Sequence, residues 1–185
     1  MITGQSGAGK GTLIREVLAR IPELETTVSA TSRARRPGEE DGRDYWFLSD
    51  DEFRRRVEED AFLEWVVYVG NRYGTLRSEL DRIQASGRAP LLELETEGAL
   101  KVAERVPGAV TVFVTAPIPE LERRLRERAT ESAGEIEERL RVAREQLEVA
   151  DRFDHVIEND DLERAVAELA GIVQRELDRA ATMSS

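Results

Sequence analysis

The sequence of 185 residues contains no cysteine, which excludes a disulfide framework and thiol chemistry. It also lacks an internal repeat, a low-complexity linker and any apolar run near the roughly 20 residues of a membrane-spanning helix. Basic residues number 27 against 38 acids, and the resulting net charge of -11 repels nucleic acid and anionic membrane surfaces. These absences favour a cytoplasmic protein with no nucleic acid, no membrane and no obligatory protein partner.

The apolar pattern that is present alternates between helical and strand periods. Strands are predicted at 91–94 and 110–114, and helices lie around them. This alternation is typical of an α/β protein with a parallel sheet, and the length suits one domain. Two stretches do not fit the pattern. They are the segment at 29–75, rich in arginine, glycine and aromatic residues, and the highly charged segment at 120–145.

The stretch from Gly4 to Thr12 reads G-Q-S-G-A-G-K-G-T and contains the spacing G-x-x-x-x-G-K of a phosphate-binding loop. Glycines let the backbone aim several N–H groups at one anion, Lys10 reaches the outer phosphates, and the following helix adds its positive end. The hydroxyl residue expected directly after the lysine is replaced by Gly11, so either Thr12 or water meets the shell of a magnesium ion. The loop residues predicted to bind a nucleotide are Gly4, Ser6, Gly7, Ala8, Gly9, Lys10, Gly11 and Thr12.

The elements predicted on either side of this loop are unequal in length. After it, Leu13, Val17 and Ile21 form one apolar helix face, and Pro22 ends the helix. Before it there is room only for residues 1–3, whereas a buried strand usually has about 5 residues. We therefore expect the natural start to lie upstream and a longer form to be more stable than this chain.

The arginine-rich run at 29–45 offers a second anion site. Its four arginines could clamp a phosphate, because guanidinium groups pair with phosphate oxygens in two-pronged fashion, and a tyrosine hydroxyl can complete the cage. The run also contains four acids, at Glu39, Glu40, Asp41 and Asp44, which equal the arginines in number. On this run alone, a solvated loop of paired charges is the alternative.

Two further motifs identify a family. Phe62-Leu63-Glu64-Trp65 is followed by Gly70-Asn71-Arg72-Tyr73-Gly74-Thr75. With the phosphate loop and the run T-S-R-x-x-R-P-G-E-x-x-G-x-D-Y, they resemble guanylate kinase, and the resemblance extends through 159–162. It implies an α/β fold with a P-loop NTPase-type parallel sheet core flanked by helices, a GMP-binding insertion and a helical lid. The implied ranges are a core at 1–28, 79–117 and 147–185, a GMP-binding segment at 29–78 and a lid at 118–146.

The resemblance also implies an activity, the magnesium-dependent transfer of the terminal phosphate of ATP to GMP, and also to dGMP, in purine nucleotide metabolism. The loop from Gly4 to Thr12 would then bind ATP, and Asn159 resembles the residue that lies near its adenine. The GMP ligands that the resemblance implies are Arg33, Arg36, Tyr45 and Tyr73 for the phosphate, and Ser29, Glu64 and Thr75 for the guanine.

The implied guanine ligands make chemical sense. Guanine presents two adjacent donors, the ring N–H and the exocyclic amine, and one carboxylate such as Glu64 accepts from both. Hydroxyls at Ser29 and Thr75 can donate to the guanine carbonyl oxygen. Adenine offers an acceptor where that ring donor would be, so a wrong base would leave buried polar groups unpaired at about 1–3 kcal/mol each.

The charged segment at 120–145 supplies the implied lid. The arginines that match those closing over the ATP phosphates are Arg124, Arg128 and Arg139, and with Lys10 they would act in catalysis by neutralising charge. The alternative is a salt-bridged helix, because this stretch alternates acids with arginines at helical spacing. Both can hold. The arginines better suited to surface pairs are Arg123, Arg126, Arg141 and Arg144.

Some positions depart from the family pattern. Gln5 stands where proline is usual. Glu95 and Glu97 stand where aspartate and glutamine are usual, and with Glu93 they would face one way on a strand and raise one another's pKa unless magnesium or arginine offsets them. We expect Glu95 near the magnesium waters or the GMP, with a wet strand face as the alternative. His155, the only histidine, is given no role.

Two other classes of protein compete with an active guanylate kinase. A guanylate-kinase-like binding module would keep the fold without catalysis, but such modules typically have a degraded phosphate loop, and here Gly4, Gly9 and Lys10 are intact. A P-loop kinase for another small phosphorylated acceptor would leave Glu64 and Thr75 without a purpose. The motifs together favour the kinase of GMP.

Overall fold

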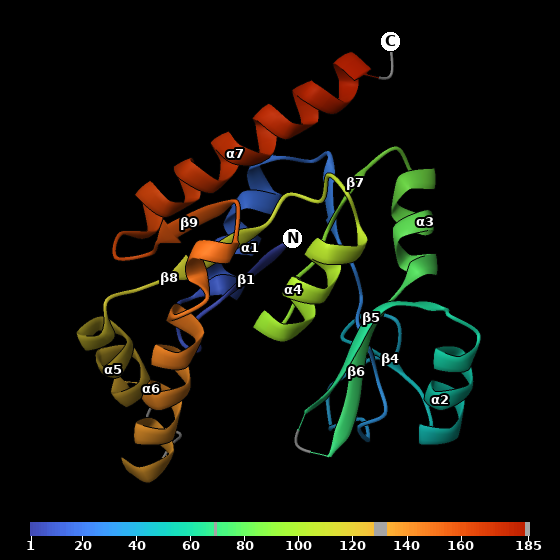
Figure 1. The fold of residues 1–185 in the computed structure, drawn as a ribbon, viewed down its shortest axis with the longest axis horizontal. Helices are drawn as coiled ribbons and strands as arrows, with labels where there is room; N and C mark the ends of the chain where they lie inside the picture. The colour runs from blue at the N-terminus through green and yellow to red at the C-terminus, as the bar shows by residue number, and fades with distance from the viewer. Residues whose placement is uncertain (69, 128–132, 184–185) are drawn as a thin grey trace.

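The computed structural model describes residues 1–68, 70–127 and 133–183 (Figure 1). Its strands are β1 (Ile2–Gly4), β2 (Leu24–Thr26), β3 (Ala30–Thr31), β4 (Trp46–Phe47), β5 (Phe62–Tyr68), β6 (Asn71–Leu76), β7 (Ala89–Leu91), β8 (Val112–Thr115) and β9 (His155–Glu158). Its helices are α1 (Lys10–Arg20), α2 (Asp50–Glu58), α3 (Arg77–Ala85), α4 (Thr96–Arg105), α5 (Ile118–Glu127), α6 (Ala133–Leu147) and α7 (Leu162–Met183), with a 3-10 turn, η1, at Ala150–Arg152. No helix in these ranges combines the length and hydropathy that crossing a membrane requires.

A parallel sheet forms the centre, as the sequence predicted. One set of strands has the order β1-β8-β9, and β2 pairs with β7. The backbone N–H of Ile2 donates to the Leu92 carbonyl at 2.8 Å, and Ile2 also bridges to Glu93. These contacts join the two sets in the order β2-β7-β1-β8-β9. The bounds of the predicted strands differ from those of β7 and β8 by one to three residues.

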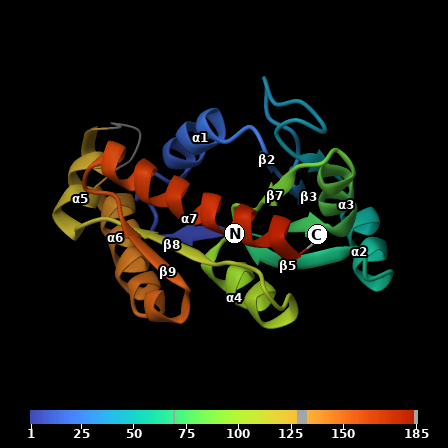
Figure 2. The same ribbon diagram turned by 90° about the horizontal axis from the view of Figure 1, so that it is seen from above.

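Helices cover both faces of this sheet, because its side chains alternate. Val112 and Val114 of β8 belong to a buried cluster with residues of α1 and α7, such as Val17 and Leu169. Phe113, between them, belongs to a second cluster that includes residues of α4. Figure 2 shows α7 crossing the sheet, with α1 and α4 to either side. The central strands are therefore buried on both faces, and polar side chains gather where the strands end.

The segment between β2 and α3 builds a separate sheet of mixed direction, with the order β4-β3-β6-β5. β5 and β6 form an antiparallel hairpin, and α2 packs against it. Phe53 of α2 stacks on Phe62 of β5, with ring centres 4.3 Å apart. Ala30 and Leu76 complete this small core. The segment thus has apolar contacts of its own, apart from those of the central sheet.

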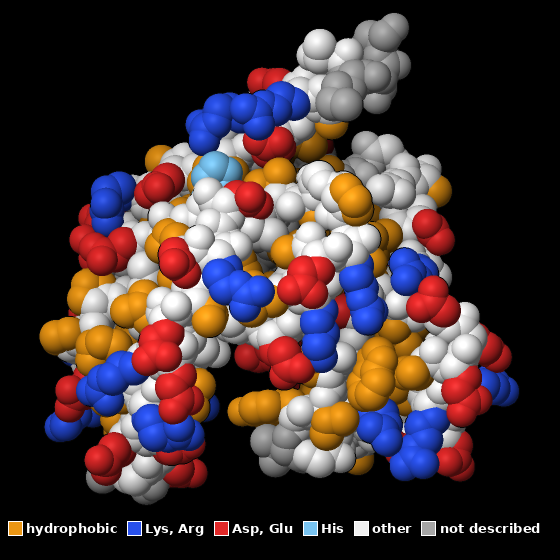
Figure 3. Space-filling model, viewed as in Figure 1, with side chains coloured by type: hydrophobic (Ala, Val, Ile, Leu, Met, Phe, Trp, Pro, Cys, Tyr) orange, Lys and Arg blue, Asp and Glu red, His pale blue; other side chains and the backbone are white. Residues whose placement is uncertain are grey.

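The helix pair α5 and α6 lies on the opposite side of the molecule from β5 and β6 (Figure 1). The surface between the two is hollowed, as Figure 3 shows below the central sheet. Charged side chains crowd the rim on the side of α5 and α6, and hydrophobic side chains lie at the edge of the opposite rim. The phosphate loop begins where β1 ends, and the chain after β7 bridges to β1 beside it, between Ile2 and Glu93.

Candidate active site

The phosphate loop connects β1 to α1. Lys10 is the first residue of α1, and its Nζ donates to the carbonyl oxygens of Gly4 at 2.9 Å and Gln5 at 3.1 Å. Burial lowers the pKa of Lys10, and the nearby carboxylates of Glu95 and Glu93 oppose that shift. The loop therefore presents one cation, held by its own backbone, at the end of the central sheet.

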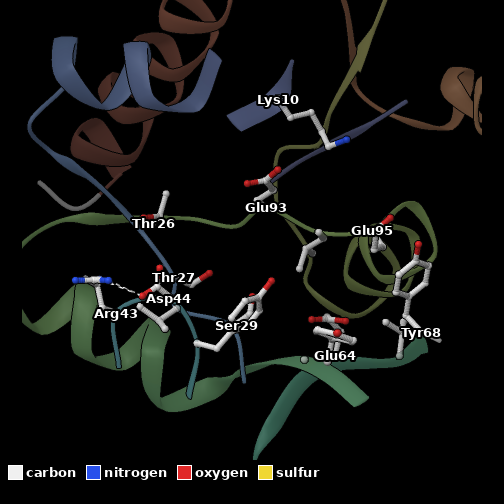
Figure 4. A pocket seen from close by; sticks show the side chains of 16 residues that line it. Lys10, Thr26, Thr27, Ser29, Arg43, Asp44, Glu64, Tyr68, Glu93 and Glu95 are labelled. Atoms are coloured by element: carbon white, nitrogen blue, oxygen red, sulfur yellow. Dashed lines mark hydrogen bonds and ion pairs between the residues drawn. The ribbon is translucent and has the colours of Figure 1, made fainter. Parts of the chain in front are cut away.

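A cavity of about 490 Å³ opens beside Lys10. Figure 4 shows Lys10 and Glu93 on one side of it, and Ser29 and Glu64 on the other. The first pair comes from the central sheet and its loop, and the second comes from the mixed sheet and the chain leading into it. Other polar residues on the wall are Thr26, Thr27, Arg43, Asp44, Tyr45, Tyr68, Tyr73 and Glu95.

Glu64 is a buried carboxylate on the wall of this cavity and is 4% exposed. The hydroxyl of Thr75, its cross-strand partner on β6, donates to Glu64 Oε1 at 2.9 Å. Gly98 makes room for the other oxygen, because a Cβ there would lie 2.9 Å from Oε2. Burial raises the pKa of Glu64, and the hydrogen bonds from Thr75 act in the opposite direction. No hydrogen bond to Oε2 is found among the residues that the structure describes, so this oxygen can accept from a donor that enters the cavity.

The residues predicted to hold the acceptor phosphate come partly together. The rings of Tyr45 and Tyr73 are 6.1 Å apart, and the guanidinium of Arg33 lies 5.4 Å from the centre of the Tyr45 ring. Arg33 donates to Glu39 at 2.7 Å, so a phosphate would have to share it or displace that carboxylate. Arg36 is exposed, and its backbone N–H donates to Glu39.

Arg43 lines the cavity, although the resemblance gave it no role. It pairs with Glu40 at 2.7 Å and with Asp44 at 2.9 Å, and all three side chains are largely exposed. Paired charges and a wall of the cavity thus coexist in this loop, so the two alternatives for the arginine-rich run are not exclusive.

The prediction that Glu93, Glu95 and Glu97 face one way on a strand is wrong. Glu93 makes only an isolated bridge, Glu95 directly precedes α4, and Glu97 lies in the first turn of that helix, where it pairs with Lys101 at 2.7 Å. Only Glu93 and Glu95 line the cavity. Partial desolvation raises the pKa of Glu93, Lys10 lowers it, and Glu95 adds to the rise.

A second cavity, of about 330 Å³, borders the same phosphate loop. Gly7, Gly9 and Thr12 line it, together with Arg124 of α5 and Asn159, which follows β9. The loop therefore has a cavity at Lys10 and another at Thr12. Two ligands could approach one loop from two sides.

Asn159 and Arg124 both donate hydrogen bonds to the backbone of the phosphate loop. The Asn159 side chain donates through Nδ2 to the Ala8 carbonyl at 2.7 Å, and Arg124 donates to the carbonyl oxygens of Ala8 at 3.3 Å and Asn159 at 2.7 Å. Glu120 accepts from Arg124 Nε at 2.7 Å. Asn159 Oδ1 is buried and has no hydrogen-bond partner among the described residues. Most buried polar atoms in proteins have a partner, so this oxygen is an exception.

Gln5 ties the loop to two other elements and is fully buried. Its Nε2 donates to the Ala143 carbonyl of α6 at 3.0 Å, and its Oε1 accepts from the Thr115 hydroxyl and from the Ala116 backbone N–H. The backbone N–H of Ser6 donates to the Gln146 side chain of α6 at 2.9 Å. Proline at position 5 could not make the bonds of the Gln5 side chain to Ala143, Thr115 and Ala116. The departure at Gln5 therefore has a structural purpose here.

Of the lid arginines predicted to be catalytic, Arg124 borders the second cavity, Arg139 is half-buried on α6, and Arg128 lies outside the described residues. Of the four arginines that the sequence assigned to surface ion pairs, three form such pairs in the structure. Arg123, Arg126 and Arg141 pair with acids on their own helices, and Arg144 is exposed.

Sequence reasoning missed Val66 and Tyr68 as part of the site. Both lie on β5, two and four residues after Glu64, and all three line the cavity. Strand side chains alternate between faces, so the period of two from Glu64 was the signal that could have found them.

Comparisons with known proteins agree on one family. The family model described as guanylate kinase matches residues 1–176. The guanylate kinase of Rubrobacter xylanophilus is 48% identical over 176 residues, which cover 95% of this chain and 92% of that protein. That of Synechococcus sp. (strain JA-3-3Ab) is 44% identical over 174 residues, covering 94% of this chain and 80% of that protein.

A solved structure gives the same result. The crystal structure of guanylate kinase from Anaplasma phagocytophilum superposes with a TM-score of 0.73 at 29% identity, and the match covers 95% of this chain and 85% of that one. Sequence and fold therefore agree along nearly the whole length. This chain belongs to the guanylate kinase family.

Proposed function

We propose that this chain transfers the terminal phosphate of ATP to GMP, giving ADP and GDP. One observation carries the proposal: Lys10 and the buried carboxylate of Glu64 line the same cavity, on opposite sides (Figure 4). Glu64 would accept from both guanine donors at one end of the acceptor. Lys10 would face the phosphate at the other end. Its relatives named guanylate kinase, at 42–48% identity, support the same activity.

The second cavity supports the donor side of the reaction. ATP phosphates would lie along the loop between Gly4 and Thr12, and Asn159, which lines this cavity, would lie near the adenine. Arg124 borders this cavity and is already aligned by Glu120. The donor and acceptor would then meet at Lys10, which belongs to the loop between them.

Phosphoryl transfer asks for alignment and charge compensation, and it needs no side-chain nucleophile. Lys10 and the arginines of the helix pair would neutralise the charge that moves from donor to acceptor. We assign the core to 1–28, 79–117 and 147–185, the acceptor segment to 29–78 and the lid to 118–146. Closure of α5 and α6 over the hollow would exclude water during transfer.

Magnesium fits the oxygen donors of this site. Mg²⁺ prefers carboxylate and hydroxyl oxygens and usually keeps several waters while it binds substrate phosphates. Thr12 on one side, and Glu93 and Glu95 on the other, are donors of this kind. Among the described residues no three acidic or histidine side chains gather into a ready-made metal cluster, which suits an ion that arrives with ATP. The bound ion would supply charge neutralisation, and Lys10 supplies the same from the protein.

The test is ADP release from ATP and magnesium with GMP, dGMP, AMP, CMP, UMP and a sugar phosphate offered separately. We expect release with the two guanine nucleotides only, because Glu64 leaves no donor for the acceptor nitrogen of adenine. Release with a sugar phosphate would assign the chain to another P-loop kinase. No release with any acceptor, from a folded protein that binds GMP, would assign it to the binding modules.

Glu64→Gln is expected to raise KM for GMP by about 10- to 100-fold, because an amide accepts from one guanine donor only and such unpaired groups cost about 1–3 kcal/mol. KM for ATP should stay near the wild-type value. Steady-state kinetics with each substrate varied in turn measure both. Wild-type kinetics with GMP would remove Glu64 from the guanine site.

The pH dependence gives the same variant a second readout. Since burial raises the pKa of Glu64, KM for GMP should rise as pH falls through that raised value in the wild type, and not in Glu64→Gln. The phosphate of GMP titrates at about pH 6 with both proteins. The difference between their two pH profiles of KM therefore reports the titration of Glu64. A raised pKa in the folded state means that the stability contribution of Glu64 is lost as pH rises through it. Near neutral pH the variant should therefore melt no lower than the wild type.

A further inference from the structure

The acceptor segment joins the core at one buried carboxylate, that of Glu79 on α3. Glu79 is 3% exposed. Its Oε2 accepts from the backbone N–H of Val28 at 2.9 Å, where the chain enters the segment, and its Oε1 accepts from Trp46 Nε1 at 3.1 Å, within the segment. Glu79 itself lies at the exit. One side chain therefore contacts the entry, the interior and the exit of residues 29–78.

The core side of this contact is held by arginine. Arg82, one turn further along α3, donates to both oxygens of Glu79, at 3.1 and 3.0 Å. Arg82 also donates to Glu25 of β2 at 2.6 Å, and Arg88 donates to the other oxygen of Glu25 at 2.9 Å. Although burial alone would raise it, the pKa of Glu79 lies below its ordinary value because of these hydrogen bonds. Arg82 thus fixes the Glu79 carboxylate on the side of the core. The same carboxylate accepts the hydrogen bonds from Val28 and Trp46.

The two residues that donate to Glu79, Val28 and Trp46, are sequence neighbours of residues that line the cavity. Val28 precedes Ser29, and Trp46 follows Tyr45; all four line the cavity or adjoin its wall. The Trp46 backbone N–H also donates to the Ser29 carbonyl at 2.9 Å, which binds the two stretches to each other. A shift of Val28 or Trp46 would therefore carry a guanine-side hydroxyl and a phosphate-side hydroxyl with it.

We propose that Glu79 is a positioning residue for the acceptor, which sets the affinity for GMP by fixing Ser29 and Tyr45 relative to the core. The proposal rests on the proposed function and assigns no contact with GMP to Glu79 itself. A carboxylate is suited to this because it accepts from four donors at once, whereas an amide turns one oxygen into a donor facing N–H groups.

The experiment compares Glu79→Gln with the wild type in steady-state kinetics, with GMP and ATP varied separately, and adds a titration of GMP binding. We expect KM and Kd for GMP to rise about tenfold, since buried hydrogen bonds of this kind contribute about 1–1.5 kcal/mol each. KM for ATP and kcat should change by less than about twofold. A merely structural role would lower melting temperature and active fraction but leave KM for GMP unchanged.

A control outside the acceptor segment is Asp154→Asn. The Asp154 carboxylate accepts from the backbone N–H and the hydroxyl of Thr111, at 2.8 and 2.7 Å, and thus ties β8 to β9 away from the acceptor segment. This variant makes the same exchange of a carboxylate for an amide, but at an exposed residue whose two bonds share one oxygen, Oδ2, which the amide oxygen can replace. It should leave KM for GMP at the wild-type value. An equal rise of KM in both variants would overturn the proposal.

Trp46→Phe keeps the test decisive if Glu79→Gln does not fold, because it removes the Trp46 bond to Glu79, together with part of the indole ring, and leaves the other bonds of Glu79 in place. We expect a rise of KM for GMP of about threefold. Where Glu79→Gln folds, combining the two variants should raise KM no further than Glu79→Gln alone, because they break one shared bond. An unchanged KM in Trp46→Phe and in Glu79→Gln, with a wild type that phosphorylates GMP, would overturn only the positioning role. A wild type that does not phosphorylate GMP would overturn the proposed function instead.

Discussion

Replacing Lys10 by alanine is expected to lower kcat/KM for GMP phosphorylation by about 10³-fold, the scale found when one preorganised group facing transition-state charge is removed. The reason is geometric. Two carbonyl oxygens of the loop hold the ammonium group at the cavity wall, so the cation is in place before the substrates arrive. Among the described residues of the phosphate loop, Lys10 is the only one whose cationic side chain lines the cavity of about 490 Å³ that Glu64 also lines.

Steady-state and single-turnover kinetics with ATP and GMP measure this loss. The sequence provides a control, because the chain contains only one other lysine, Lys101. Lys101 pairs with Glu97 on the surface of α4, and Lys101→Ala should change kcat/KM by no more than about twofold. If Lys10→Ala kept near wild-type turnover, phosphate neutralisation by the loop lysine would be wrong.

Gly4→Ala is expected to destabilise the protein by more than about 4 kcal/mol and so to prevent folding under ordinary conditions. Gly4 has φ +145, a conformation that residues with a Cβ rarely adopt. A Cβ at this position would lie 2.0 Å from the Val114 carbonyl oxygen and 2.6 Å from the Val114 nitrogen. Both atoms belong to the neighbouring strand β8, which pairs with β1 at this residue and cannot move without breaking the central sheet.

Gly11→Ala is the matched control for this prediction. Gly11 lies in α1, and a Cβ there would meet nothing within 4 Å. Alanine should therefore stabilise the helix by about 0.5–1 kcal/mol. Denaturant unfolding followed by circular dichroism measures both variants. A Gly4→Ala protein with a wild-type unfolding midpoint would show that the pairing of β1 with β8 tolerates the extra atom.

The sequence predicted what depends on local rules. The phosphate loop follows from glycines, a lysine and a helix start within nine residues, and the parallel sheet follows from alternating periods. The stretch L-E-L-E-T-E misled for the same local reason, because it fits a strand period of two. The residues after it decided otherwise: Ala99 and Val102 form the buried face of a helix, and that helix begins at Thr96.

What the sequence could not predict depends on contacts between distant residues. Glu79 meets Val28 and Trp46 across 51 and 33 positions, and Gln5 meets Ala143 across 138. No pattern in a short window encodes such a partner. The resemblance predicted residues that contact the implied substrates, and it gave no prediction for residues such as Glu79 that would position them.

The neighbouring strands β2 and β7 have a consequence for how this protein could change over time. They are paired in register, from Leu24 with Ala89 to Thr26 with Leu91, although the whole acceptor segment lies between them in the chain. The polypeptide thus leaves the central sheet and returns directly beside its point of departure. Recombination could replace the acceptor segment together with α3 without reordering the sheet, so that lineages could exchange acceptor specificity as one unit while inheriting the strands of the central sheet and the phosphate loop unchanged.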